Sequence, residues 1–155
     1  MSRSKDIGTV AESAVVAYLR AHGWPSAERR ALAGAQDLGD ITGTPGIVWE
    51  IKGGKAAESA SDGLIEDWLA ETVRECENAR AELGVLVTKR PGYGPARAAS
   101  WWAHVDLTDW AYVAGAMPPV PEDLLSAPLR MHLSTMVGIL RAAGYGEPLV
   151  EAVAA

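Results

Sequence analysis

Residues 39–52 read GDITGTPGIVWEIK and place Asp40, Glu50 and Lys52 in a segment that otherwise looks like a buried hairpin. Its centre, GTPG, supplies a proline with a restricted φ and a glycine with a permissive one, as a chain reversal requires. The apolar residues of IVWEIK alternate with other side chains, as in a half-buried strand. We therefore predict a hairpin in which residues 40–42 pair with residues 47–52.

The charged side chains of this hairpin share one face. Alternation along the strand puts Glu50 and Lys52 on the face opposite to Trp49 and Ile51. A reversal centred on Pro45 brings Asp40 opposite Glu50, where Cβ atoms lie roughly 4.5–5.5 Å apart and two carboxylates repel. A divalent cation between them would remove the repulsion. Oxygen ligands without a zinc-type set of histidines and cysteines favour Mg²⁺, with Mn²⁺ as a possible substitute.

Lys52 would lie beside such an ion, where it could orient or help to deprotonate a water and stabilise charge on a phosphate. This layout suits the hydrolysis of phosphodiester bonds. The alternative is structural: Glu50 and Lys52 form a solvated ion pair worth about 0–1 kcal/mol. Asp40 would then only hydrogen-bond within its turn.

The rest of the chain predicts an α/β domain with a mixed central sheet flanked by helices. Apolar spacing indicates a helix over residues 7–22, a long helix that begins with Asp62 as N-cap and carries its apolar stripe to Leu83, and a final helix over about 129–143. Strands are expected within residues 24–33, at 84–88 (GVLVT), and as edge strands at 101–107 and 110–114. We divide the chain into a core (1–115), a proline-rich linker (116–128) and a C-terminal helix and tail (129–155).

Length and composition set the class of protein. A chain of 155 residues, 48% hydrophobic and 22% charged, suits one globular domain. Glu12 and Arg20 interrupt the first apolar stretch, so we expect neither a signal peptide nor a membrane span, and a cytoplasmic location. Cys76 is the lone cysteine, which excludes an intrachain disulfide, and three scattered histidines do not have zinc-ligand spacing.

The net charge of −6 argues at first against a nucleic-acid partner. The charge is unevenly distributed, however. Residues 58–83 hold eight acids against two arginines, whereas residues 84–105 hold three basic residues and no acid. An acidic helix and tail could therefore mask a basic face.

The segments GTVAESAVVAYLRAHGW, RRALAGAQDLGDI, IVWEIKGGK and GVLVTKRPGYG resemble, in this order, the PD-(D/E)xK nuclease superfamily, and within it the Holliday junction resolvase-like endonucleases. The likeness covers residues 7–94, and ILRAAGYG extends it toward the small resolvases of actinobacterial phages. The resemblance implies a restriction-endonuclease-like core in the order α-β-β-β-α-β with a C-terminal helical extension, magnesium-dependent nuclease activity and a homodimer.

The resemblance also implies roles for individual residues. Asp40 and Glu50 look like the metal-binding acids, Lys52 like the catalytic lysine and Glu12 like a further catalytic and metal-binding acid, with the backbone carbonyl of Ile51 as another ligand. Glu12 has an alternative, because an acid in the first turns of a helix is favoured by the helix dipole.

Two departures from the family pattern stand in the loop before Asp40. The motif's proline is Gly39 here, and the serine that cellular resolvases often carry in this loop is missing from ALAGAQ. Asp37 could be a secondary metal ligand, but a loop-capping role is the more common one for an aspartate at such a position.

Basic residues on both sides of this site could bind the phosphates of branched or duplex DNA with little base readout. Five residues are expected to do so: Arg29, Arg30, Lys55, Lys89 and Arg90. For Arg97 an ordinary solubilising role is preferred. Trp68, Trp101 and Trp102 could pack in the core, anchor a dimer interface or, for the last two, stack on bases.

These features together predict a metal-dependent DNA endonuclease that resolves four-way junctions. A repair, flap or nicking nuclease of the same superfamily is the nearest alternative. A non-catalytic DNA-binding or adaptor protein on the same scaffold is the alternative from another class.

Overall fold

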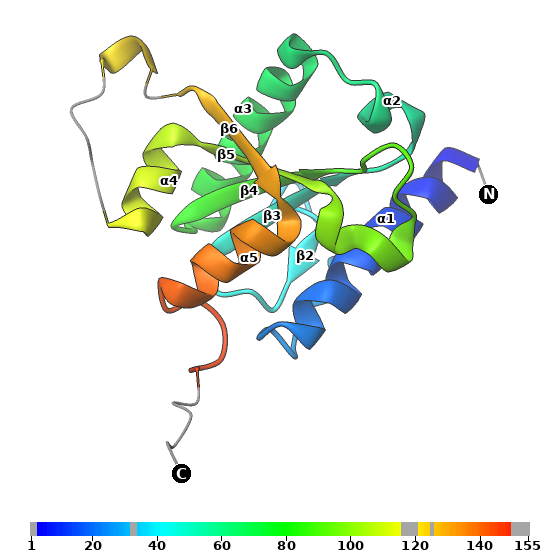
Figure 1. Cartoon of the computed structure of the whole chain (residues 1–155), viewed down its shortest axis with the longest axis horizontal. Coiled ribbons are helices and arrows are strands. Elements are labelled where there is room, and N and C mark those ends of the chain that lie inside the picture. The colour runs from blue at the N-terminus through cyan, green and yellow to red at the C-terminus, as the bar shows by residue number, and fades with distance from the viewer. Residues whose placement is uncertain (1–2, 32–33, 116–120, 125, 150–155) are drawn as a thin grey trace.

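The computed structural model describes residues 3–31, 34–115, 121–124 and 126–149 of the chain. The described part is an α/β fold in which helices cover a mixed sheet (Figure 1). Its elements are, in chain order, α1 (Arg3–Ala21), β1 (Glu28–Arg29), β2 (Ile41–Thr42), β3 (Ile47–Lys52), α2 (Gly54–Glu58), α3 (Asp62–Ala79), β4 (Leu83–Thr88), the 3₁₀ helix η1 (Pro95–Ser100), β5 (Trp102–Asp106), α4 (Leu107–Ala114), η2 (Glu122–Leu124), β6 (Pro128–His132) and α5 (Leu133–Ala142).

The main sheet has the strand order β3-β4-β5-β6. β3 and β4 run parallel, because α3 crosses over between them, and the two remaining pairs are antiparallel. The predicted mixed sheet flanked by helices is therefore confirmed. β1 and β2 form a separate antiparallel pair next to it.

The two faces of the sheet differ in what covers them. Ile47, Trp49 and Ile51 point into the main hydrophobic core with residues of α1, η1 and α5, as alternation along β3 predicts. The other face carries Glu50 and lies against α3, which approaches so closely that a Cβ on Gly84 would stand 2.9 Å from the side chain of Thr72. The charged face of β3 is thus the α3 face.

The predicted hairpin is only partly right. The chain does reverse at 43–46, where the N–H of Ile47 donates to the carbonyl of Thr44, but β2 pairs in a ladder with β1 and not with β3. The strand expected within residues 24–33 takes that place as the two-residue β1. Asp40 still reaches β3, through a hydrogen bond from its own N–H to the carbonyl of Trp49 (2.8 Å).

The long helix has different ends from those predicted. Its N-cap is Ser61, whose Oγ accepts from the N–H of Leu64, and Asp62 is the first helical residue. The helix ends at Ala79 because Arg80 adopts a left-handed conformation, so Leu83 begins β4.

Residues 110–114 were expected to be an edge strand but belong to α4. Asp106 caps this helix by accepting from the N–H of Thr108 (2.7 Å), and Gly115 ends it with a left-handed φ of 67°. The helix expected over 129–143 begins only at Leu133, because residues 128–132 are the edge strand β6. Both mistakes have the same cause: short apolar runs fit a strand and a helix equally well.

The C-terminal region shares the sheet and the core of the rest of the chain. β6 pairs with β5, and the buried face of α5, which crosses one face of the sheet in Figure 1, joins the main core. Residues 116–120 and 125 of the predicted linker lie outside the described residues. No helix of the described residues is long and apolar enough to span a membrane.

Candidate active site

Asp40 is held against β3 by its backbone and its side chain together. Besides the bond from its N–H to Trp49, its Oδ2 accepts a hydrogen bond from the N–H of Ile51 (2.7 Å). Gly39 makes this approach possible: it has a φ of +84°, and a Cβ there would stand 2.7 Å from the Cγ1 of Val48 and 3.0 Å from the carbonyl oxygen of Trp49. Proline cannot adopt this φ, so the proline of the motif that the sequence resembles would not fit this backbone.

Glu50 and Lys52 form the next part of the site. Nζ of Lys52 lies 2.6 Å from Oε1 of Glu50 and 3.6 Å from Oε2 of Glu71 on α3, and it stands over the ring of Trp68 at 5.7 Å. The lysine is therefore half-buried between β3 and α3. Trp68, which was expected to pack in the core or at a dimer interface, borders the site through this contact.

Glu50 is close enough to Asp40 to disturb the ionisation of that aspartate. Burial raises the pKa of Asp40 to about 7, and the charge of Glu50 adds to this against the hydrogen bond from Ile51. Burial likewise raises the pKa of Glu50 to about 7, although Lys52 opposes the shift. Burial works against the ammonium of Lys52, but the Glu50 carboxylate outweighs it and raises the pKa of the lysine. The site thus joins a half-buried and a buried acid, each with a pKa near neutrality, to a protonated lysine.

Glu12 lies on α1 at the edge of this site. Its charge also raises the pKa of Asp40, which places the two acids near one another, but its Oε2 accepts from Nε of Arg29 at 2.7 Å. The charges of Glu50 and Glu12 both raise the pKa of Asp40, and hard carboxylate oxygens are the ligands that Mg²⁺ or Mn²⁺ prefers.

Two acids of the site were not predicted. Among the described residues, the acids whose oxygens lie within 4.8 Å of one another are Asp37, Glu71 and Glu75, not the predicted set. Glu71 and Glu75 stand four residues apart on α3, so they share one helix face. That spacing was available in the sequence, but the acids of residues 58–83 were interpreted as a solvated face. Asp37 also has the predicted loop-capping role, since its Oδ1 accepts from the N–H of Gly39 (3.2 Å).

Three of the five basic residues expected to bind DNA are engaged within the protein. Arg29 pairs with Glu12, Lys89 pairs with Glu58, and Nε of Arg30 donates to the carbonyl of Gly39 (3.1 Å). Lys55 is exposed. The fifth, Arg90, belongs to a stack of rings and guanidinium groups.

The centre of this stack is Trp102. The guanidinium carbons of Arg90 and Arg130 lie 4.3 Å and 4.5 Å from its ring centroid, and the ring of His132 stacks on it at 5.1 Å. Arg90 and Arg97 also each lie 4.2 Å from the ring centroid of Tyr93. Trp101, by contrast, is fully buried in the core.

The stack and the acids lie on one face of the sheet. Lys52 pairs with Thr88, Thr88 with Trp102 and Trp102 with His132, and partners across a sheet point to the same side. In the neighbouring row, Glu50 is followed by Leu86, His104 and Arg130. Two rows of side chains therefore run from the acidic site on β3 to the basic and aromatic stack on β5 and β6.

No protein-family model, curated protein or solved structure matches this chain significantly. The function must therefore be argued from the site.

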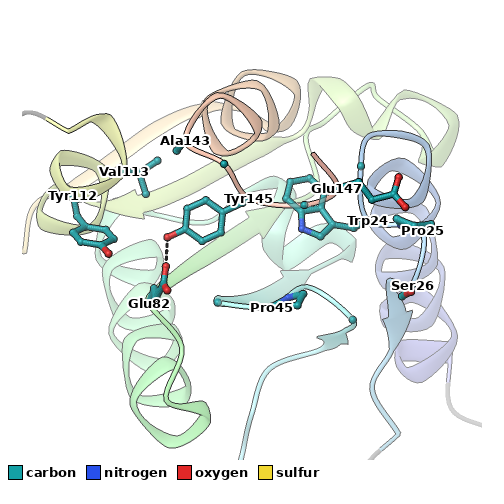
Figure 2. Close-up of a pocket in the computed structure, with 15 residues that line it drawn as sticks. Trp24, Pro25, Ser26, Pro45, Glu82, Tyr112, Val113, Ala143, Tyr145 and Glu147 are labelled. Carbon is teal, nitrogen blue, oxygen red and sulfur yellow. Dashed lines mark hydrogen bonds between the residues drawn. The ribbon is translucent and has the colours of Figure 1, made fainter. Parts of the chain in front are cut away.

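A pocket of about 930 Å³ lies elsewhere and contains none of the predicted site residues. Figure 2 shows that Trp24, Pro45 and Tyr145 line it and that the hydroxyl of Tyr145 donates to Glu82. It lies near the start of β3, whereas the acids stand toward the strand's carboxyl end. In α/β sheets ligands bind outside the carboxyl ends of the strands, and the residues that line the pocket include no pair of acids with a pKa raised to about 7. Asp40 and Glu50 are therefore the stronger candidate site.

Proposed function

We propose that this protein is a metal-dependent DNA endonuclease of the PD-(D/E)xK type, with four-way junctions as its substrate. The observation that carries the proposal is the convergence of Asp40, Glu50 and Lys52 toward the carboxyl end of β3. A buried Glu50 and a half-buried Asp40, both with a pKa raised to about 7, are costly in a fold unless they serve a ligand, and perturbed acids of this kind gather at functional sites.

Each residue has a defined part in the proposed reaction. Asp40, Glu50 and the carbonyl of Ile51 would hold the divalent ion, with Glu12 completing the acidic set. Mg²⁺ or Mn²⁺ bound there would supply positive charge for a phosphodiester and lower the pKa of a bound water. Lys52 is held as an ammonium by Glu50, so its role is to position the water and neutralise developing charge on the phosphate rather than to act as the base.

The substrate is proposed from the rows of side chains that lead away from the acids. Arg90 and Arg130 present positive charge and hydrogen-bond donors around Trp102, on the same face as Glu50, and Nε2 of His132 accepts from Arg90. Guanidinium groups bind phosphates, and an aromatic face can stack on an unpaired base. Leu86, Thr88 and His104, which lie between the stack and the acids, are buried. The arrangement therefore supports a DNA contact at the stack on β5 and β6, beside the acids and not across the covered part of the sheet.

The test is cleavage of labelled four-way junction, flap, nicked and linear duplex DNA with Mg²⁺. The wild type should cut the junction with symmetric nicks. Asp40→Asn, Glu50→Gln and Lys52→Ala should each lose about 100-fold or more in rate while still binding the junction. Asp67→Asn is the matched control, because Asp67 is exposed on α3 and should leave cleavage unchanged.

The alternatives predict other outcomes. Cleavage of flaps or duplexes without cutting of junctions would point to a repair, flap or nicking nuclease. Binding of DNA by the wild type without cleavage of any substrate would overturn the nuclease proposal and favour the adaptor. Symmetric cutting also requires two active sites related by a two-fold axis, so the proposal includes a homodimer, whose mass can be measured by light scattering.

A further inference from the structure

Glu75 is the most unusual acid of the molecule. Its side chain is 2% exposed, and neither carboxylate oxygen has a hydrogen-bond partner among the described residues. An unpaired buried carboxylate is strongly destabilising, and buried charges in proteins are normally paired or bound to a metal. The proposed nuclease reaction makes no use of this side chain.

Two further acids face Glu75. Glu71 stands one helical turn before it on α3, and Asp37 comes from the loop before Asp40, with one oxygen of each of the three within 4.8 Å of the others. The loop is fixed against α3 because Nδ2 of Asn78 donates to the carbonyl of Asp37 (3.1 Å). Glu71 from α3 and Asp37 from the loop therefore converge on the buried, unpartnered carboxylate of Glu75.

The separation of the three oxygens suits a cation. Oxygens that share a Ca²⁺ ion at 2.3–2.6 Å can lie up to about 5 Å apart, and those that share Mg²⁺ up to about 4 Å. Ionised carboxylates at this separation repel one another, and a shared divalent cation relieves the repulsion.

We propose that Asp37, Glu71 and Glu75 form a second divalent-cation site, directly beside the one formed by Asp40 and Glu50. Lys52 lies between the two, since its Nζ contacts both Glu50 and Glu71. The ligands are all carboxylates, so the site takes a hard cation such as Mn²⁺, Mg²⁺ or Ca²⁺. Binding at this site does not require that the protein be a nuclease.

The experiment counts the Mn²⁺ ions bound by the full-length protein at pH 8, by equilibrium dialysis with electron paramagnetic resonance of the free ion. The wild type should bind two ions. Glu75→Gln and Glu71→Gln should each lose one of them or weaken it at least tenfold, and Asp40→Asn should lose the other. Glu77→Gln is the control, because it removes the same charge from an exposed position of the same helix and should keep both ions.

Thermal melting adds a readout independent of the ion count. Without metal, the Tm of Glu75→Gln should be higher than that of the wild type, because the substitution removes the buried unpaired charge. Added Mn²⁺ should raise the Tm of the variant less than it raises the Tm of the wild type. Circular dichroism checks that each variant is folded, and Glu71→Gln replaces Glu75→Gln if the latter is not.

The outcomes separate this inference from the proposed function. Two ions retained in both Glu71→Gln and Glu75→Gln, or a wild type that binds one ion and loses it only in Asp40→Asn, would overturn the second site and leave the nuclease proposal standing. A single ion lost only in the Glu71 and Glu75 variants would support the second site and contradict the metal site at Asp40 and Glu50. If the wild type bound no Mn²⁺ at all, both metal sites would be overturned. A proton would then relieve the repulsion among the acids.

Discussion

At the scale of single residues, Asp40 fixes the backbone of its loop and is also one of the two acids that we propose to bind the metal ion. It ties the loop before β2 to the backbone of β3 on both sides of Glu50, and this same contact buries its carboxylate beside a second acid. The hydrogen bond from Ile51 offsets part of the free-energy cost of burying the carboxylate. The rest of this cost destabilises the fold as long as no ligand is bound. Stability and function are therefore opposed at this position.

This opposition predicts a pH dependence. The folded pKa of Asp40, about 7, is above its ordinary value of 3.8, so the folded protein keeps a proton that the unfolded chain has released. Stability that is present below pH 4 is accordingly lost as the pH rises toward 7. Asparagine can still accept from Ile51 but carries no charge. Asp40→Asn should therefore raise the free energy of unfolding at pH 8 by up to about 4 kcal/mol and have little effect near pH 4.

Urea unfolding in the presence of a chelator, at pH 4.5 and pH 8, measures this difference. The exposed Asp67→Asn serves as the control and should change stability equally little at both values. A loss of stability in Asp40→Asn at pH 8 would show that the hydrogen bond of the carboxylate outweighs its repulsion by Glu50.

At the scale of elements, the sequence predicted the parts with a long or distinctive pattern. The periodicity of α1 and the alternation of β3 were sufficient, because each follows from burial of one face. β2 was assigned to the wrong partner, since a ladder between the two-residue strands β1 and β2 depends on a contact distant in the sequence. α4 and β6 were misassigned because a short apolar run is too short to show the periodicity of a helix or a strand. The cap at Asp106 makes α4 a helix, and pairing with β5 makes β6 a strand.

Pairing across β4, β5 and β6 buries a histidine and predicts a second pH effect. His104 is 3% exposed and shares a hydrogen bond with Oγ1 of Thr88 (3.0 Å). Burial, with the charge of Arg130 beside it, lowers its pKa from 6.5 to about 4. The unfolded chain therefore binds a proton that the folded protein does not, and stability falls as the pH drops from 6.5 to 4.

His104→Gln keeps a hydrogen-bonding group but cannot titrate. Between pH 7 and pH 5 the wild type should lose about 2 kcal/mol more stability than the variant. The comparison is made between the two proteins, because the buried acids gain stability over the same range. Urea unfolding at both pH values gives the four free energies, and equal changes in the two proteins would show that His104 titrates normally in the fold.

At the scale of the whole molecule, the site was more predictable than its surroundings. Asp40, Glu50 and Lys52 could be found because one local segment carries all of them, and alternation on β3 fixed the face they share. Glu71, Glu75 and the stack around Trp102 depend on how α3 and the last strands pack over that face. A sequence pattern does not specify such packing. The acidic face of α3 was therefore interpreted as exposed to solvent, although part of it packs over the sheet.

The C-terminal region shows the same dependence on packing and gives the last prediction. Leu140 on α5 is fully buried in the core cluster that also contains Trp49 and Trp101, residues distant from it in the chain. Leu140→Ala should therefore lower the free energy of unfolding of the entire protein by about 2–5 kcal/mol, in one transition that tryptophan fluorescence and circular dichroism report alike. Leu149→Ala, at a side chain that is 63% exposed, should leave that transition in place. If residues 129–155 were an independent extension, Leu140→Ala would leave the fluorescence transition of the core where it is in the wild type and shift only a separate, smaller one.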